Sequence, residues 1–141
     1  MKTDIGDKEQ ANRMLGISHL DHLVLTVADL DKTCEFYEKV LGFEIATFGQ
    51  GRRAMAFGKQ KFNLHQAGQE FEPRALRPTP GSMDLCLITP LALDVVVERL
   101  KHAAVPIEAG PINRTGAQGP ILSVYIRDPD HNLIEISTYD V

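Results

Sequence analysis

The sequence contains two short stretches with one alternating pattern, Lys61-Phe62-Asn63-Leu64-His65-Gln66 and Asn132-Leu133-Ile134-Glu135-Ile136. Successive side chains of a β-strand point to opposite faces, so each stretch predicts a strand with one apolar and one polar face. The polar face carries His65 in the first strand and Glu135 in the second. A histidine and a carboxylate on equivalent strands suggest a metal site built by an internal duplication.

The first stretch closes a series of predicted elements. The apolar, β-branched segment 19–27 predicts a strand. Helical spacing of apolar residues predicts a helix over 30–41, capped by Asp29 and ended by Gly42. Three strands are then expected, separated by glycine-containing turns, at 43–48, 53–57 and 61–66. The first half therefore consists of a strand, a helix and three strands.

The second stretch closes the same series again. An apolar strand is predicted at 83–89, followed by Thr89 as a helix cap and Pro90 as the first helical residue. The helical stripe reaches residue 104, and Pro106 ends that helix. Strands are then expected at 107–109, 122–127 and 133–138, with segment 114–119 as an insertion.

These two series predict an α+β protein made of two βαβββ modules. We expect a frayed N-terminal tail over 1–16 and a single domain over 17–141. Within that domain, module one spans 17–67, a Pro- and Gly-rich linker spans 68–82, and module two spans 83–141. A length of 141 residues suits one such domain.

Sliding one half over the other pairs four polar residues. A shift of 62 residues places His22 on Asp84, and after the insertion a shift of 70 places His65 on Glu135. Each lies among apolar neighbours, where an unpaired polar group would be costly to bury. Two nitrogens and two carboxylates suit a divalent ion such as Zn²⁺, Fe²⁺, Mn²⁺, Co²⁺ or Ni²⁺. The remaining histidines lack this register: His19, His102 and His131.

Asn63 competes with His65 for the fourth ligand position. The two side chains share one face of the strand. A turn shifted by two residues would put Asn63 opposite Glu135, and the spacing leaves both possibilities open. A single histidine on such a strand is more often a hydrogen-bonded core residue than a metal ligand.

Composition excludes several classes of protein. A net charge of −4 provides no basic surface for nucleic acid. No apolar run is long enough to span a membrane, and the N-terminus has no signal-peptide core. The two cysteines lie in apolar patterns, which favours reduced thiols and a cytoplasmic location. Local basic residues could still bind a small anion, namely Arg52, Arg53 and Arg114.

Several segments of the sequence resemble those of a known protein family. The segments 20–27, 36–43 and 128–135 (Asp-Pro-Asp-His-Asn-Leu-Ile-Glu) are similar to the vicinal oxygen chelate superfamily, which includes glyoxalase I, extradiol dioxygenases and bleomycin-resistance proteins. Segments 61–65, 71–73, 80–82, 84–89 and 114–121 resemble the glyoxalase domain-containing protein 5 group and its bacterial relatives, the glyoxalase-like virulence proteins. The resemblance covers 17–141.

The resemblance implies a fold and a ligand set. It implies that the two modules form a curved mixed sheet around a cleft with the helices outside, commonly in a homodimer. His22 and Glu135 match the family's first-strand and last-strand ligands. Asp84 takes a position usually held by histidine, and His65 falls on or beside the fourth position. Whether one chain or two supply a site stays open.

The function expected from this inventory is that of a metal-dependent glyoxalase I-like lyase. Such an enzyme isomerises the hemithioacetal of a 2-oxoaldehyde and a thiol such as glutathione, through an enediolate held by the metal. Glu135 is the expected base, with Asn63, Arg52, Arg53 and Arg114 as candidate substrate contacts. Two alternatives are an extradiol-type dioxygenase, against which Asp84 counts, and a non-catalytic small-molecule binding protein of bleomycin-resistance type.

Overall fold

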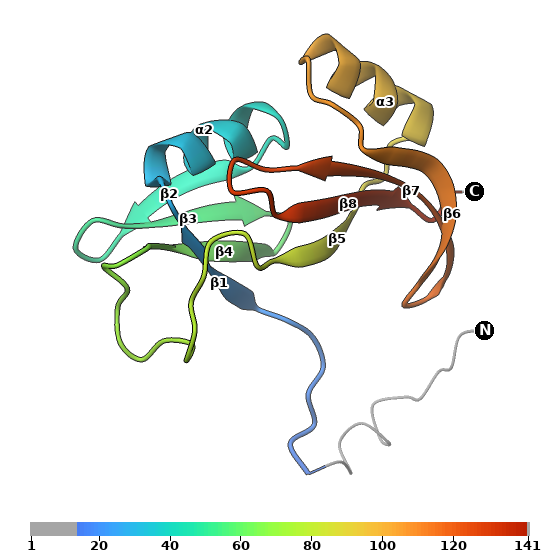
Figure 1. Ribbon diagram of the computed structural model, residues 1–141. Helices are drawn as coiled ribbons and strands as arrows, with labels where there is room; N and C mark the ends of the chain where they lie inside the picture. The colour runs from blue at the N-terminus through green and yellow to red at the C-terminus, as the bar shows by residue number, and fades with distance from the viewer. Residues whose placement is uncertain (1–13, 141) are drawn as a thin grey trace.

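The fold confirms the two predicted modules. The structure is a computed structural model that describes residues 14–140, so most of the expected N-terminal tail lies outside the described residues. In chain order the elements are β1 (His22–Val27), α2 (Leu30–Lys39), β2 (Glu44–Phe48), β3 (Arg52–Phe57), β4 (Gln60–Gln66), β5 (Asp84–Ile88), α3 (Leu93–His102), β6 (Ala109–Gly116), β7 (Gly119–Arg127) and β8 (Leu133–Thr138) (Figure 1). Each module is thus a βαβββ unit.

Each module forms its own four-stranded mixed sheet. The strand orders are β1-β4-β3-β2 and β5-β8-β7-β6. The first strand of each module pairs in parallel with the last, and the other neighbours are antiparallel. As a result β1 and β5 are edge strands, whose outer backbone groups have no partner strand in the described chain.

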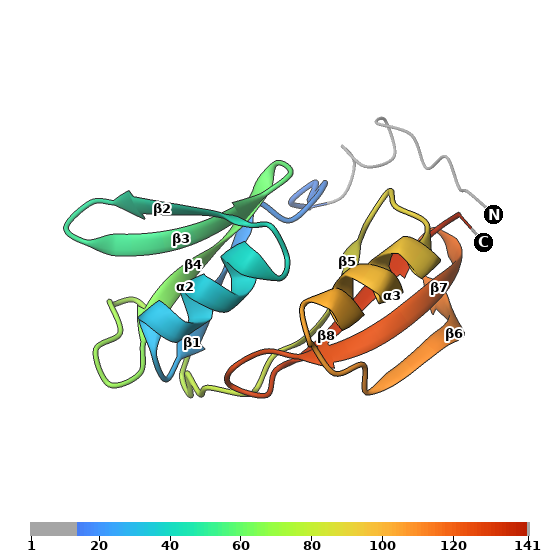
Figure 2. The ribbon, with the colours of Figure 1, turned by 90° about the horizontal axis from the view of Figure 1, so that it is seen from above.

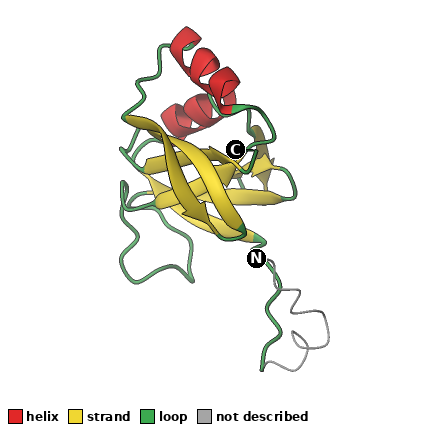
Figure 3. Cartoon of the chain, turned by 90° about the vertical axis from the view of Figure 1, so that its right-hand side faces the viewer, coloured by secondary structure: helices red, strands yellow, loops and turns green. Residues whose placement is uncertain are grey.

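The two sheets lie side by side and carry both helices on the same side (Figures 2 and 3). Alternate strand residues, such as Leu25, Phe62 and Ile134, join residues of both helices in one buried core. The intervening residues point to the opposite side. We call this helix-free side the open face; it carries His22, Asn63 and His65 in module one and Asp84, Cys86, Ser123, Tyr125, Glu135 and Ser137 in module two.

A buried polar contact ties the modules together. The phenol of Tyr37 on α2 donates to Oδ2 of Asp128 at 2.7 Å, and the amide of Asn132 donates to the same oxygen at 2.8 Å. All three side chains are buried. Burial, helped by the negative charge of Asp128, raises the pKa of Tyr37, so the phenol keeps the proton that it donates.

We expect Tyr37→Phe to lower the free energy of unfolding by about 2 kcal/mol, because a buried carboxylate would lose a charge-assisted hydrogen bond. Urea unfolding followed by circular dichroism measures this loss. Tyr139→Phe is the control, since Tyr139 is partly exposed and its hydroxyl accepts only from the backbone of Gln118 in the described residues. Equal loss in both variants would contradict a special role for the Tyr37–Asp128 contact.

The largest differences from the predicted boundaries are in module two. Helix α3 begins at Leu93 rather than after Thr89, because the Thr89 backbone N–H bonds to Ser137 and continues the sheet, while its hydroxyl accepts from Leu91. The expected insertion 114–119 lengthens a hairpin: β6 and β7 have 8 and 9 residues, against 5 and 6 in the equivalent β2 and β3. Most of the insertion belongs to β6 and β7, which pair from Ile112 with Ser123 to Gly116 with Gly119.

Candidate functional site

His22 begins β1 on the open face, and one of its ring nitrogens has no hydrogen-bond partner among residues 14–140. Its Nδ1 lies 2.8 Å from Oδ2 of Asp21, and its side chain is 43% exposed. The same hydrogen bond lowers the pKa of Asp21, which therefore stays ionised beside the ring. A carboxylate at Nδ1 fixes the proton there and leaves the lone pair at Nε2. His22 is therefore arranged as a metal ligand or an acceptor through Nε2.

Glu135 lies at the centre of the open face of module two. The hydroxyl of Ser123 donates to its Oε2 at 2.6 Å, and that of Ser137 approaches the same oxygen at 3.4 Å. In the described residues Oε1 accepts no hydrogen bond, and the half-buried side chain leaves it within reach of solvent. One carboxylate oxygen is thus held by the protein and the other is available.

Asp84 begins β5, as His22 begins β1. Its side chain is exposed on the open face near Arg127, whose pKa is raised mainly by its hydrogen bond to Glu108 and to a lesser degree by the charge of Asp84. Arg127 itself is directed to Glu108, which it binds at 2.8 and 2.9 Å. Asp84 is therefore a carboxylate that no guanidinium in the described chain holds through a hydrogen bond.

The strand pairing corrects the register of the duplication. His22 pairs with Lys61, and its equivalent Asp84 pairs with Leu133. Lys61 is therefore equivalent to Leu133, a shift of 72 (133 minus 61), and Asn63 rather than His65 is equivalent to Glu135. The predicted shift of 70 is therefore wrong by two residues. One of them lies in the turn before β8, because the paired residues Arg127 and Leu133 are six positions apart whereas Ala56 and Lys61 are five apart, and the other lies before β7.

Asn63 also contains a buried, unsatisfied hydrogen-bond acceptor. Its Oδ1 is buried, and within residues 14–140 it is the one buried side-chain oxygen or nitrogen without a hydrogen-bond partner. Such an atom is costly unless a water, ligand or ion reaches it. Asn63 lies beside Val24 on β1, two residues from His22. The position equivalent to Glu135 thus also offers a free oxygen.

His65 lies two residues further along β4 and is packed rather than open. It is 4% exposed, next to Thr26, and its ring meets that of Phe71 edge to face at 5.5 Å between centroids. Desolvation, with a smaller contribution from the charge of Arg52, lowers the pKa of His65 below its usual value. A neutral, enclosed imidazole is the result.

This environment predicts a pH effect. Because folding lowers the His65 pKa, the neutral ring stabilises the fold above the unfolded pKa of about 6.5, and this stability is lost as the pH falls through the lower folded value. NMR titration of the ring protons should give His65 a pKa below about 6.5, the value of an unperturbed histidine. A His65 pKa at or above that value would contradict the packed arrangement.

The three candidate arginines lie in different places. Arg52 is on the open face, stacked 4.3 Å from the Phe71 ring centre. Arg53 points to the helix side, where it binds Asp31 at 2.7 Å and contacts Cys34. Arg114 lies on β6 and donates to the Tyr125 hydroxyl at 2.9 Å. Arg52 and Arg114 therefore share a face with the ligand candidates, whereas Arg53 does not.

Sequence reasoning missed the neighbours of Glu135 on β7. Tyr125 pairs directly with Glu135, and Ser123 pairs with Ser137. Both β7 residues alternate with the buried Val124 and Ile126, and this alternation marks the open face of the strand. The strand pattern could have revealed the shared face, but not the partner of each residue.

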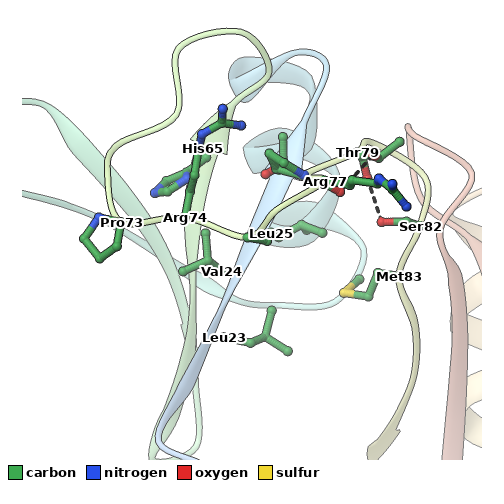
Figure 4. Close-up of a pocket in the computed structure, with 13 residues that line it drawn as sticks. Leu23, Val24, Leu25, His65, Pro73, Arg74, Arg77, Thr79, Ser82 and Met83 are labelled. Carbon is green, nitrogen blue, oxygen red and sulfur yellow. Dashed lines mark hydrogen bonds between the residues drawn. The ribbon is translucent and has the colours of Figure 1, made fainter.

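A cavity of about 540 Å³ opens beside edge strand β1, between it and the segment that follows β4 (Figure 4). Its floor is apolar, and it has the size of a small-molecule site. Two arginines, Arg74 and Arg77, lie on its wall, although Arg74 is bound by Glu72 at 2.7 Å. Val24, Thr26 and His65 also line it, so the cavity adjoins the open face of module one.

The four predicted ligands do not meet within one chain. Among residues 14–140, no three His, Cys, Asp or Glu side chains are close enough to hold a metal ion. His22 lies on one sheet, and Asp84 and Glu135 on the other. No helix of the described part is long and apolar enough to cross a membrane.

Comparison with known proteins agrees with the fold and the motifs. Residues 19–136 match the Glyoxalase/Bleomycin resistance protein/Dioxygenase superfamily. The chain is 58% identical over 123 residues to virulence protein STM3117 of Salmonella typhimurium, covering 87% of this chain and 85% of that protein. The crystal structure of STM3117 superposes with a TM-score of 0.86, covering 87% of this chain and 98% of that one.

Two further relatives have different names. The glyoxalase domain-containing protein RDO1 of Mycosarcoma maydis is 51% identical over 132 residues, which is 94% of this chain and 74% of that protein. The fosfomycin resistance protein FosX of Listeria innocua is 30% identical over 123 residues, covering 85% of this chain and 89% of that protein. The predicted family resemblance is thereby confirmed.

Proposed function

Because this chain belongs to the Glyoxalase/Bleomycin resistance protein/Dioxygenase superfamily, we propose that it is a metal-dependent isomerase of the glyoxalase I type. Its substrate would be the hemithioacetal of a 2-oxoaldehyde and a thiol such as glutathione. One observation carries the proposal: His22, Asp84, Glu135 and Asn63 occupy the same two equivalent strand positions on the two open faces.

The proposed site is shared between two copies of the chain. The ligand candidates of one chain lie on separate sheets, and each sheet ends in an edge strand, β1 or β5. A twofold dimer that sets module one of one copy against module two of the other would bring His22 to Asp84 and Glu135. It would also cover both edges and form two identical sites.

The donor atoms fit a divalent metal ion. His22 is oriented by Asp21 with Nε2 free, Glu135 has one free oxygen, and the Oδ1 of Asn63 is buried without a partner. With Asp84, these residues would hold the ion, in a set of one nitrogen and three oxygens. His65 is the weaker candidate for the fourth place, because it is enclosed and two residues out of register.

Glu135 is the proposed base. Its free Oε1 would take the proton from the hemithioacetal carbon, which bears the hydroxyl and the sulfur, and return it to the adjacent carbonyl carbon. The hydroxyl hydrogen would pass to the oxygen of that second carbon, so the product is an isomeric thioester and no oxidant or reductant is needed. A bound divalent ion would supply Lewis-acid stabilisation of negative charge on the two adjacent substrate oxygens. Arg52 and Arg114 share the open face and would bind the carboxylates of the thiol. The cavity beside β1 offers room for the part of the substrate that does not react.

Thioester formation tests this function. Protein stripped of metal and reloaded with Zn²⁺, Ni²⁺, Co²⁺, Mn²⁺ or Fe²⁺ is given methylglyoxal and glutathione, and the absorbance of the thioester is followed. We expect turnover with at least one ion and none after chelation. Absence of thioester with every ion would reject the glyoxalase I assignment. Oxygen uptake with a catechol and Fe²⁺ would instead indicate a dioxygenase.

The similarity to FosX favours a second candidate, which is modification or binding of fosfomycin. The same metal ligands and cationic side chains would suit a small anionic antibiotic. Incubation of the metal-loaded protein with fosfomycin, followed by ³¹P NMR, separates the two candidates. A new phosphorus signal without thioester activity would replace the glyoxalase proposal. An unchanged signal would show that this chain, unlike what the name of FosX says of that relative, does not modify fosfomycin.

A further inference from the structure

A chain of hydrogen-bonded side chains lies behind Glu135, on the same open face of module two. The Ser123 and Ser137 hydroxyls are 2.6 Å apart, and both side chains are completely buried. The Sγ of Cys86 lies 3.2 Å from the Ser137 hydroxyl. With the 2.6 Å bond from Ser123 to Oε2 of Glu135, these contacts connect four side chains from three strands.

The hydrogens in this chain have one consistent direction. Each hydroxyl carries a single hydrogen, and that of Ser123 is donated to the carboxylate. Ser137 must then donate to Ser123, with part of its hydrogen directed to Oε2 at 3.4 Å. Cys86 is left as the donor to Ser137. Every donor therefore points toward Glu135.

We infer that Ser123, supported by Ser137, is the positioning residue for Glu135, fixing Oε2 so that Oε1 faces the substrate and the metal ion. A hydrogen bond to a carboxylate is about twice as strong as one between neutral groups, and a chain of donors strengthens its last member. Loss of the Ser123 hydroxyl would free the carboxylate to rotate. The effect of Ser123 on metal binding rests on the proposed function, whereas the hydrogen bonds that hold Glu135 do not depend on it.

The inference predicts graded effects on metal binding. Removing a partner that orients a ligand typically weakens metal affinity by about 10- to 100-fold. We expect Ser123→Ala to raise the Zn²⁺ dissociation constant by about this factor, measured by titration calorimetry on the full-length apoprotein. Ser137→Ala should have a smaller effect, because its hydroxyl reaches Oε2 only at 3.4 Å. Cys86→Ala should have the smallest, since it contacts neither Glu135 oxygen in the described chain.

Thr138→Val is the matched control. Thr138 follows Ser137 on β8, is also buried, and points to the opposite side of the sheet, where its hydroxyl accepts from the Asp140 backbone. Its loss should reduce stability without changing Zn²⁺ affinity. A purely structural role for Ser123 would give the same result as this control. If Ser123→Ala does not fold, Ser123→Cys fills the same position with a slightly larger side chain and a weaker donor.

A metal-free measurement keeps the inference separate from the proposed function. The carboxyl ¹³C signal of Glu135 in labelled apoprotein should move in Ser123→Ala and stay in place in Thr138→Val. An unchanged signal, or a Zn²⁺ affinity within twofold of the parent protein, would overturn the positioning role. If the signal moves but the parent protein binds no Zn²⁺, the positioning role stands and the metal-dependent function fails.

Discussion

Replacing Glu135 by glutamine should lower kcat/KM for thioester formation by about a thousandfold, because the amide keeps the size of the side chain but cannot accept the proton. Oε1 of Glu135 reaches solvent on the open face, whereas Oε2 is occupied by the Ser123 hydroxyl. One oxygen therefore serves the reaction and the other fixes its position. The neutral amide also weakens one ligand of the proposed metal site.

Two comparisons isolate the role of the base. Glu98→Gln, on the exposed side of α3, makes the same chemical change away from the open face and should leave the rate unchanged. The Glu135→Gln assay is run at a Zn²⁺ concentration that saturates the variant, determined by calorimetry. A rate that recovers fully at saturation would show that Glu135 only binds the ion. A rate that remains low would support its role as the base.

The strands could be predicted from the sequence because the alternation of apolar and polar residues that marks a strand involves only neighbouring positions. Alternation of Phe62 and Leu64 with Asn63 and His65 requires only that one face of β4 be buried, and the structure buries both apolar residues in the core. The same alternation identified β8 and Glu135. The predicted α+β modules follow from these local patterns, as does the helix that Gly42 ends with its left-handed backbone at φ 73°.

The residue at the fourth ligand position could not be predicted from the sequence, because it depends on the lengths of the connections between strands. A strand register that slips by two residues keeps every side chain on its face, so the pattern of β4 is equally satisfied by Asn63 and His65. The turn 128–132 before β8 contributes one of the two residues of that slip, and it is held by Asp128, whose Oδ1 accepts from the backbone of Asp130 and Asn132. No periodicity in the sequence reveals that turn geometry.

The sequence also could not show that the candidate metal ligands of one chain lie on separate sheets. It depends on how the two modules pack, and that packing includes the contact from Tyr37 to Asp128, 91 residues apart. A further backbone N–H, at Ala28, bonds to Asp130 of the same turn. Such long-range contacts hold the sheets side by side, with no helix of the described chain over either open face. Two modules related by duplication could equally have closed on each other.

Mixing two inactive variants should restore activity if the site is shared. His22→Ala removes a ligand from module one, and Glu135→Gln removes one from module two. In a mixed dimer, one site receives both defects, whereas the other combines the intact His22 of one chain with the intact Glu135 of its partner. Half of the dimers are mixed at equal expression and each has one good site, so about a quarter of the parent activity is expected.

The control for this experiment uses two variants within one module. Asp84→Asn and Glu135→Gln both lie in module two, so every site of every dimer contains one of the two defects and no activity should return. Co-expression with two different affinity tags allows the mixed dimers to be purified before assay. A site built within one chain would give no recovery in either mixture, because each chain would carry its own defect. Recovery with His22→Ala and none with Asp84→Asn therefore requires that module one of one copy completes module two of the other.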